Sequence, residues 1–70
     1  MTVKTYPIKR PITALFDHLI VEQLPKSIVK KLGSIQETGF HLSLGRRDLY
    51  FEGGSVAYVL GSSQAEVELS

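Results

Sequence analysis

The chain contains no cysteine and no tryptophan. Without cysteine no disulfide can stabilise the fold, and its absence favours a reducing compartment, so we expect a cytoplasmic protein. Structural zinc sites are built mostly from cysteine, whereas this chain offers only His18, His41 and carboxylates, so we expect no metal site. A domain of 70 residues that lacks both kinds of cross-link must rely on an efficient core or on oligomerisation, for example as a homodimer.

Long hydrophobic runs are also missing from the chain. No apolar stretch approaches the ~20 residues that span a bilayer, and residues 1–10 lack the apolar centre of a signal peptide. The hydrophobic content of 43% is nevertheless typical of a folded protein. We therefore expect one small domain over residues 1–70 that has no contact with a membrane.

Charge is small in total but unevenly distributed. The net charge is +1, yet residues 1–32 carry six Lys or Arg against two carboxylates, which is a net +4. Residues 33–70 carry two Arg against five carboxylates, which is a net −3. Such asymmetry indicates either a binding surface or two solvated faces that attract each other.

The first half of the chain predicts an arm followed by two helices. Residues 1–10 are interpreted as an N-terminal arm or an edge strand that ends near Pro7. Residues 12–32 are expected to form two helices that separate at Pro25, because the residue before a proline is disfavoured in a helix. Apolar residues of the first helix fall on one stripe at helical spacing: Ile12, Leu15, Phe16, Leu19, Ile20 and Leu24. Gly33 is well placed to end the second helix.

From residue 39 the hydrophobic period changes to two, as in strands with one buried face. Turn residues separate four such runs: Gly45-Arg46, Gly53-Gly54 and Gly61 to Gln64. These loops would place Leu49 opposite both Leu42 and Tyr58, and Phe51 opposite Val56. The predicted fold is an α+β domain in which two N-terminal helices pack on a four-stranded antiparallel β-meander over residues 39–70, in two layers.

No pattern of residues points to catalysis or to a cofactor. Asp17 and His18 are adjacent in a predicted helix and point about 100° apart, so they do not form an acid–base pair. The six glycines suit turns and helix caps and lack the spacing of a phosphate-binding loop. We expect neither an enzyme nor a small-molecule substrate.

The outer face of the predicted sheet is the first candidate for a binding surface. Tyr50 would lie at its centre with His41 and Val59 nearby, and Arg46 and Arg47 would lie at the adjacent hairpin tip. Tyrosine and arginine are enriched among binding hot spots. A terminal strand at residues 65–69 would also expose unpaired backbone groups. These features predict a non-enzymatic protein-binding module, such as a small regulator or inhibitor that occupies a surface on a larger protein or forms a homodimer.

The alternative prediction is nucleic-acid binding by the basic helical half. Its candidate residues are Lys9, Arg10, Lys26, Lys30 and Lys31. Residues 27–39 resemble the middle of a helix-turn-helix, with a short helix, a turn at Gly33 and a polar second helix. Two features disfavour this alternative: Glu37 would face phosphates, and no aromatic side chain lies among the basic residues to stack on bases.

Overall fold

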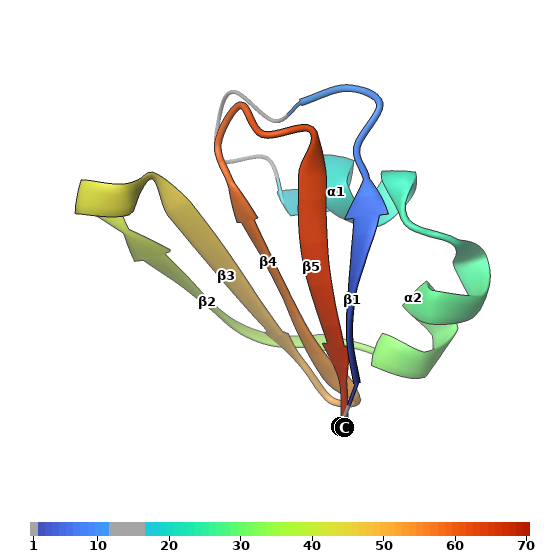
Figure 1. The fold of residues 1–70 in the computed structure, drawn as a ribbon. Helices are drawn as coiled ribbons and strands as arrows, with labels where there is room; N and C mark the ends of the chain where they lie inside the picture. The colour runs from blue at the N-terminus through green and yellow to red at the C-terminus, as the bar shows by residue number, and fades with distance from the viewer. Residues whose placement is uncertain (1, 12–16) are drawn as a thin grey trace.

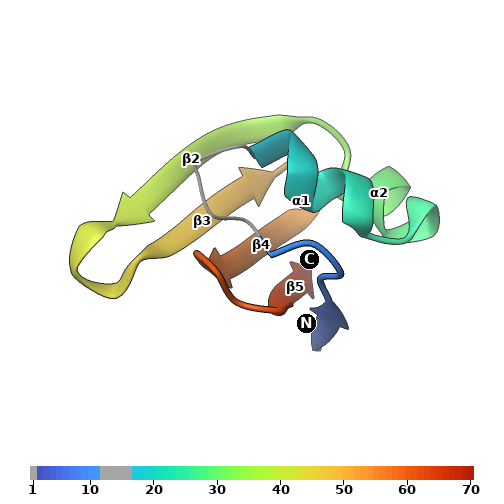
Figure 2. The same cartoon turned by 90° about the horizontal axis from the view of Figure 1, so that it is seen from above.

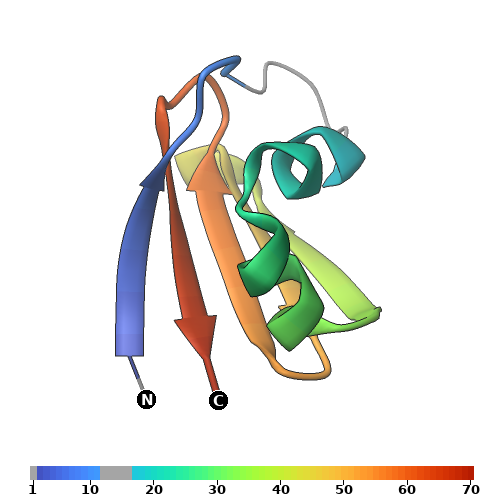
Figure 3. The same cartoon turned by 90° about the vertical axis from the view of Figure 1, so that its right-hand side faces the viewer.

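The computed structural model describes residues 2–11 and 17–70 (Figure 1). The elements follow in the order β1 (Thr2–Pro7), α1 (Asp17–Gln23), α2 (Lys26–Leu32), β2 (Ile35–His41), the short 3-10 helix η1 (Leu42–Leu44), β3 (Arg46–Phe51), β4 (Gly54–Val59) and β5 (Gln64–Leu69). The strands form one antiparallel sheet in the order β1-β5-β4-β3-β2. Both helices lie on the same side of this sheet (Figures 2 and 3). Neither α1 nor α2 has the length and apolar character needed to cross a membrane.

The predicted four-stranded meander with two N-terminal helices is wrong, because the sheet has five strands and the first precedes the helices. The edge strand predicted as one form of residues 1–10 is present as β1, and all six of its residues pair with β5. β5 is therefore an inner strand, so the prediction that residues 65–69 expose a free edge is also wrong. The pairing of β1 with β5 joins the two ends of the chain, and no local alternation of side chains reveals such a contact.

The helices agree with the sequence pattern where the structure describes them. Helix α2 begins after Pro25 and ends at Leu32. The next residue, Gly33, has φ of 75° and donates its N–H to the carbonyl of Val29. Helix α1 lies within the predicted first helix. Ile12, Leu15 and Phe16 lie outside the described residues, so their predicted packing stays a prediction.

The helix-turn-helix interpretation of residues 27–39 is wrong. Residues 35–41 form β2, an edge strand that pairs with β3, rather than a second helix. The strand begins four residues before the predicted one, and residues 42–44 turn out of the sheet as η1. The predicted pair of Leu42 with Leu49 is replaced by Thr38 with Leu49.

The other two turns begin one residue earlier than predicted. Glu52 and Gly53 form the β3–β4 turn, so Val56 lies opposite Leu49 rather than Phe51. Residues 60–63 connect β4 to β5, which places Tyr58 opposite Ala65. Moving a loop by one residue shifts cross-strand partners by two and leaves each side chain on its face of the sheet. The predicted pairs are therefore wrong, although Leu49, Phe51 and Val56 do share one face.

The hydrophobic core fills the space between this face and the helices. Its members are Ile8, Ile20, Leu24, Ile28, Leu32, Leu49, Val56, Tyr58, Ala65 and Val67. Leu49, Val56 and Val67 face one another across β3, β4 and β5 and are fully buried, as are Ile20 and Leu32 on the helices. Phe51 and Leu69 are only partly buried. Because the core lies entirely on the helix side, the opposite face of the sheet is left for other contacts.

Candidate functional site

The outer face is the side of the sheet that no described helix covers, and it is turned toward the viewer in Figure 1 with α1 behind it. Strand alternation places on it the residues that neighbour the buried positions. From β2 to β1 these are Glu37, Gly39, His41, Tyr50, Asp48, Arg46, Ser55, Ala57, Val59, Glu68, Glu66, Thr5 and Val3.

Asp48 is the most unusual residue of the outer face, because it is a carboxylate with only 7% of its surface exposed. Arg46 Nε donates a hydrogen bond to Asp48 Oδ1 at 3.0 Å, and His41 Nε2 lies 2.9 Å from Asp48 Oδ2. Arg46 and Asp48 are two residues apart on β3 and so share a face, while His41 lies opposite Arg46 on β2. The two basic side chains thereby cover one carboxylate.

This cluster holds Arg46 in a defined position. The hydrogen bond to Asp48, together with the charge of that carboxylate, raises the pKa of Arg46 above its ordinary value. Arg46 uses its Nε toward Asp48, which leaves the N–H groups of its two terminal nitrogens for a ligand. A guanidinium that is already oriented loses less conformational entropy on binding than a free one.

Exposed apolar side chains surround the cluster. Tyr50 is 42% exposed, Val59 is 47% exposed, and Leu44 in η1 is 67% exposed. The Tyr50 ring lies beside Gly39 of the neighbouring strand, where a Cβ atom would be 4.0 Å from the ring edge. An aromatic side chain packed across a strand glycine compensates for the missing side chain and holds the ring against the sheet.

A shallow groove made of two adjoining hollows, which share Arg46 and Ala57, follows β4 along the outer face. Its floor is made by the small residues Ser55 and Ala57, and Arg46 and Tyr50 line it on the β3 side. Glu66 lines it on the β5 side. A groove with a floor of small side chains and one rigid aromatic wall can receive side chains from a partner surface.

The structure brings together four of the five residues predicted for protein binding: Tyr50, Arg46, His41 and Val59 all lie on the outer face. Arg47 does not, because it lies within β3 beside Arg46 and alternation turns it to the helix side, opposite Tyr58. The prediction that both arginines project from a hairpin tip is wrong, since β3 begins at Arg46 and the turn before it ends at Gly45.

The basic residues predicted for nucleic-acid binding do not form one cluster. Lys9 and Arg10 lie in the connection after β1 and line one groove, whereas Lys31 lines another together with Lys4. Lys26 and Lys30 are exposed on α2 and line neither groove. The helical half of the molecule is basic, but its charges are spread over several surfaces.

Sequence reasoning missed Asp48 and Lys4 as candidate binding residues. An Arg-x-Asp spacing within a strand places both side chains on one face, so this signal could have identified Asp48. Lys4 gains its significance only from the pairing of β1 with β5, which brings it beside Val67. Among the described residues no group of three or more His, Asp or Glu could hold a metal ion.

Neither a protein-family model, nor a curated protein sequence, nor a solved structure matches this chain. The outer face must therefore be interpreted from its own geometry.

Proposed function

We propose that this protein is a non-enzymatic binding module whose outer face docks on another protein. The observation that carries the proposal is the combination of Tyr50 with the Arg46–Asp48–His41 cluster on a sheet face that no described helix covers. Tyrosine and arginine are the residue types most enriched at the centres of protein interfaces. Both are held against the sheet before a partner arrives, which lowers the entropic cost of binding.

The charge of the outer face indicates what the partner surface should carry. Glu37, Asp48, Glu66 and Glu68 oppose the single arginine Arg46, so the face has an excess of negative charge. Charge complementarity steers association and selects partners. We propose a partner surface with an apolar centre that meets Tyr50 and Val59, surrounded by lysine or arginine.

The module is proposed to act as a small regulator or inhibitor by occupying a surface on a larger protein. The proposed cytoplasmic location rests on the absence of cysteine. A homodimer is a second form of the same proposal, in which the outer face would meet another copy.

Site-specific photo-crosslinking tests this proposal. A benzophenone amino acid would replace Tyr50 in one protein and Lys26, which is exposed on α2, in a matched control. We expect irradiation in host lysate to give a covalent product with one protein from position 50 and none from position 26. A product of twice the mass of the chain would identify the homodimer.

The affinity of the identified pair then tests the residues. We expect Tyr50→Ala and Arg46→Ala each to raise the Kd at least tenfold, and Lys26→Ala to change it less than twofold. Circular dichroism of each variant would establish that it is folded before the Kd is measured. Crosslinking from position 26 alone, or full affinity of a folded Tyr50→Ala variant, would overturn the assignment of the outer face.

Nucleic acid is the competing partner, and the same preparation distinguishes it. A nucleic-acid complex should weaken steeply as salt is raised, and Lys30→Ala with Lys31→Ala should flatten that dependence. Because residues 35–41 form a strand and not the second helix of a helix-turn-helix, only the basic charge of the helical half supports this alternative. Retention of the crosslinked product after nuclease treatment would favour a protein partner.

A further inference from the structure

A groove runs between β1 and α2 on the helix side of the sheet. Val67 and Leu69 of β5 form its floor, Ile28 and Lys31 line it from α2, and Lys4 and Tyr6 line it from β1. It encloses about 430 Å³. Figure 3 shows β1 and α2 on either side of this part of the sheet. The outer face has no part in it.

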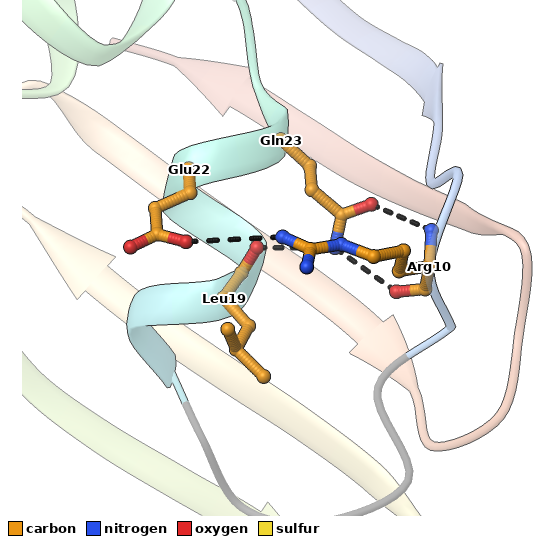
Figure 4. A network of polar contacts seen from close by, with 4 residues as sticks. All are labelled: Arg10, Leu19, Glu22 and Gln23. Carbon is orange, nitrogen blue, oxygen red and sulfur yellow. Dashed lines mark hydrogen bonds and ion pairs between the residues drawn. The ribbon is translucent and has the colours of Figure 1, made fainter.

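The groove continues past Tyr6 toward the connection that follows β1. Tyr6 also lines the next hollow, together with Lys9, Arg10, Glu22, Leu24 and Pro25. Gln23 fixes this end, because its side chain accepts a hydrogen bond from Arg10 N at 2.8 Å and donates one to Arg10 O at 2.9 Å (Figure 4). The two hollows thus follow one side of β1 along an apolar floor. Their walls carry four basic side chains, two in each hollow, against the carboxylate of Glu22 in the second.

No described strand pairs with the outward edge of β1, which borders this groove. β1 lies at one edge of the sheet and pairs with β5 on its other side. Just beyond the end of β1, Ile8 N donates a hydrogen bond to Ser63 O at 2.7 Å. Hydrogen-bonded pairs alternate along an antiparallel ladder, so Tyr6 and Lys4 bond to β5, while the N–H and C=O groups of Val3 and Thr5 point to the free edge. Pro7 has no N–H and falls at the next outward position, in agreement with this alternation.

The opposite edge of the sheet is less suited to receive a strand. β2 shifts register between Ile35 and Glu37, and such a bulge interrupts the regular row of backbone groups. β1 pairs without interruption over all six residues, so the outward N–H and C=O groups of Val3 and Thr5 recur regularly up to Pro7, which has no N–H. A strand added to this sheet would therefore extend it beyond β1.

The charges beside the groove indicate which residues an added strand should carry. Within the described parts of the chain, no carboxylate forms an ion pair with Lys4 or Lys31. The ion pair of Arg10 with Glu22 is long, at 4.0 Å, and both side chains are largely exposed. An inward lysine on an edge strand disfavours pairing with another copy, because the two β1 strands would bring their lysines together. An acidic strand would instead be attracted.

We propose that the free edge of β1 takes up an extended acidic segment of a partner protein by strand addition. Val3 and Thr5 would form the backbone hydrogen bonds, and carboxylates at alternate positions of the added strand would meet Lys4 and Lys31 above the apolar floor. This site is separate from the proposed function on the outer face, so each can fail while the other stands.

Peptide titration tests the proposal with the protein as it is. The probes are a capped eight-residue peptide of alternating glutamate and valine, a matched peptide of alternating lysine and valine, and a single-stranded oligothymidine, each with a fluorescent label. We expect only the glutamate peptide to raise its anisotropy, with an affinity that falls as salt is added. Equal or tighter binding of the lysine peptide or of the oligonucleotide would overturn the acidic assignment.

Substitutions at one backbone position separate strand addition from a purely electrostatic contact. Thr5→Pro removes an outward N–H without touching the ladder to β5, and Thr5→Val keeps that N–H. We expect Thr5→Pro to lower the affinity for the glutamate peptide at least tenfold and Thr5→Val to lower it less than twofold. Nuclear magnetic resonance spectra would establish that both variants are folded. Lys4→Glu with Lys31→Glu should abolish binding of the glutamate peptide, and Tyr50→Ala should leave it within twofold. Wild-type affinity in a folded Thr5→Pro variant, or a dimer that Thr5→Pro dissociates, would overturn the proposal.

Discussion

Replacing Gly53 by alanine should remove much of the stability of this domain. An alanine Cβ at this position would lie 2.0 Å from the carbonyl oxygen of Lys31 and 3.3 Å from that of Leu32. Since real Cβ contacts essentially never fall below 3.0 Å, the end of α2 and the β3–β4 turn would have to move apart by at least about 1 Å. That movement would also disturb the hydrogen bond that Gly53 N donates to Leu32 O at 2.8 Å.

The magnitude follows from these two effects. Overpacking costs about 1–3 kcal/mol, and a backbone group that loses its partner costs up to about 1–3 kcal/mol more, so we expect a loss of roughly 2–6 kcal/mol. A chain of 70 residues has a total stability of roughly 3.5–10 kcal/mol. Thus Gly53→Ala should remove a large fraction of the free energy of unfolding.

Gly61→Ala provides the matched control, because it tests backbone conformation without crowding. Gly61 has φ of 82°, and beyond its chain neighbours no atom lies within 4 Å of the position that a Cβ would occupy. Alanine there costs only the strain of the left-handed region, about 1 kcal/mol. Urea denaturation followed by circular dichroism would give the free energy of unfolding of both variants. Equal losses, or a smaller loss for Gly53→Ala, would refute the close approach of the β3–β4 turn to α2.

Three further experiments test the packing and the cluster. In urea denaturation, Leu49→Ala should lower the free energy of unfolding by about 3 kcal/mol and Phe51→Ala by about 1.5 kcal/mol. The reason is that Leu49 is fully buried, whereas the larger Phe51 is only partly buried. A larger loss for Phe51→Ala would mean that the centre of the core lies elsewhere. A double-mutant cycle of Arg46→Ala and Asp48→Asn should give a coupling free energy of about 0.5–1 kcal/mol, since Arg46 is partly exposed; zero coupling would show that the contact contributes nothing to folding. Tyr50→Ala should lower the thermal midpoint only slightly, because a cross-strand aromatic contact contributes about 0.2–1 kcal/mol, and a loss of several kcal/mol would mean that the ring belongs to the core.

The sequence predicts the faces of the central strands better than their partners. The alternation of apolar and polar residues around Leu49, Phe51 and Val56 indicates that one face of these strands is buried. A turn displaced by one residue leaves each side chain on the same face, so this prediction is unaffected. The cross-strand partner of each residue, in contrast, depends on which residue is the first of the turn. The turn pattern predicts Gly53 in first place, but Gly53 stands second, since Glu52 takes the first place.

Contacts between distant segments cannot be predicted in the same way. β1 has Lys4 and Tyr6 on its inner side, a pattern without the apolar alternation that marks a strand, because it lies at the margin of the core. β2 is mostly exposed, so Ile35 to Thr38 carry no buried stripe of either period. Both edge strands depend on backbone pairing with a neighbour more than on side-chain burial.

The candidate site, too, is predictable where it depends on local alternation and not where it depends on strand pairing. Alternation alone places Tyr50, His41 and Val59 on one face, and the structure agrees. Arg46 joins them because it belongs to β3 rather than to the predicted hairpin tip. The short distances from Asp48 to Arg46 and His41 depend on the pairing of β2 with β3, which the local pattern assigns incorrectly. Consequently the surface is predictable from the sequence, whereas the cluster at its centre is not.

Methyl spectra of the protein bound to its crosslinked partner would test the central claim, that the outer face is the docking surface. Valines act as reporters on both sides of the sheet: Val59 is exposed on the outer face, whereas Val29 is partly buried on α2. In a valine-labelled sample, binding should shift or broaden the methyl signals of Val59 and leave those of Val29 unchanged. Changes at Val29 with an unperturbed Val59 would contradict the assignment of the outer face.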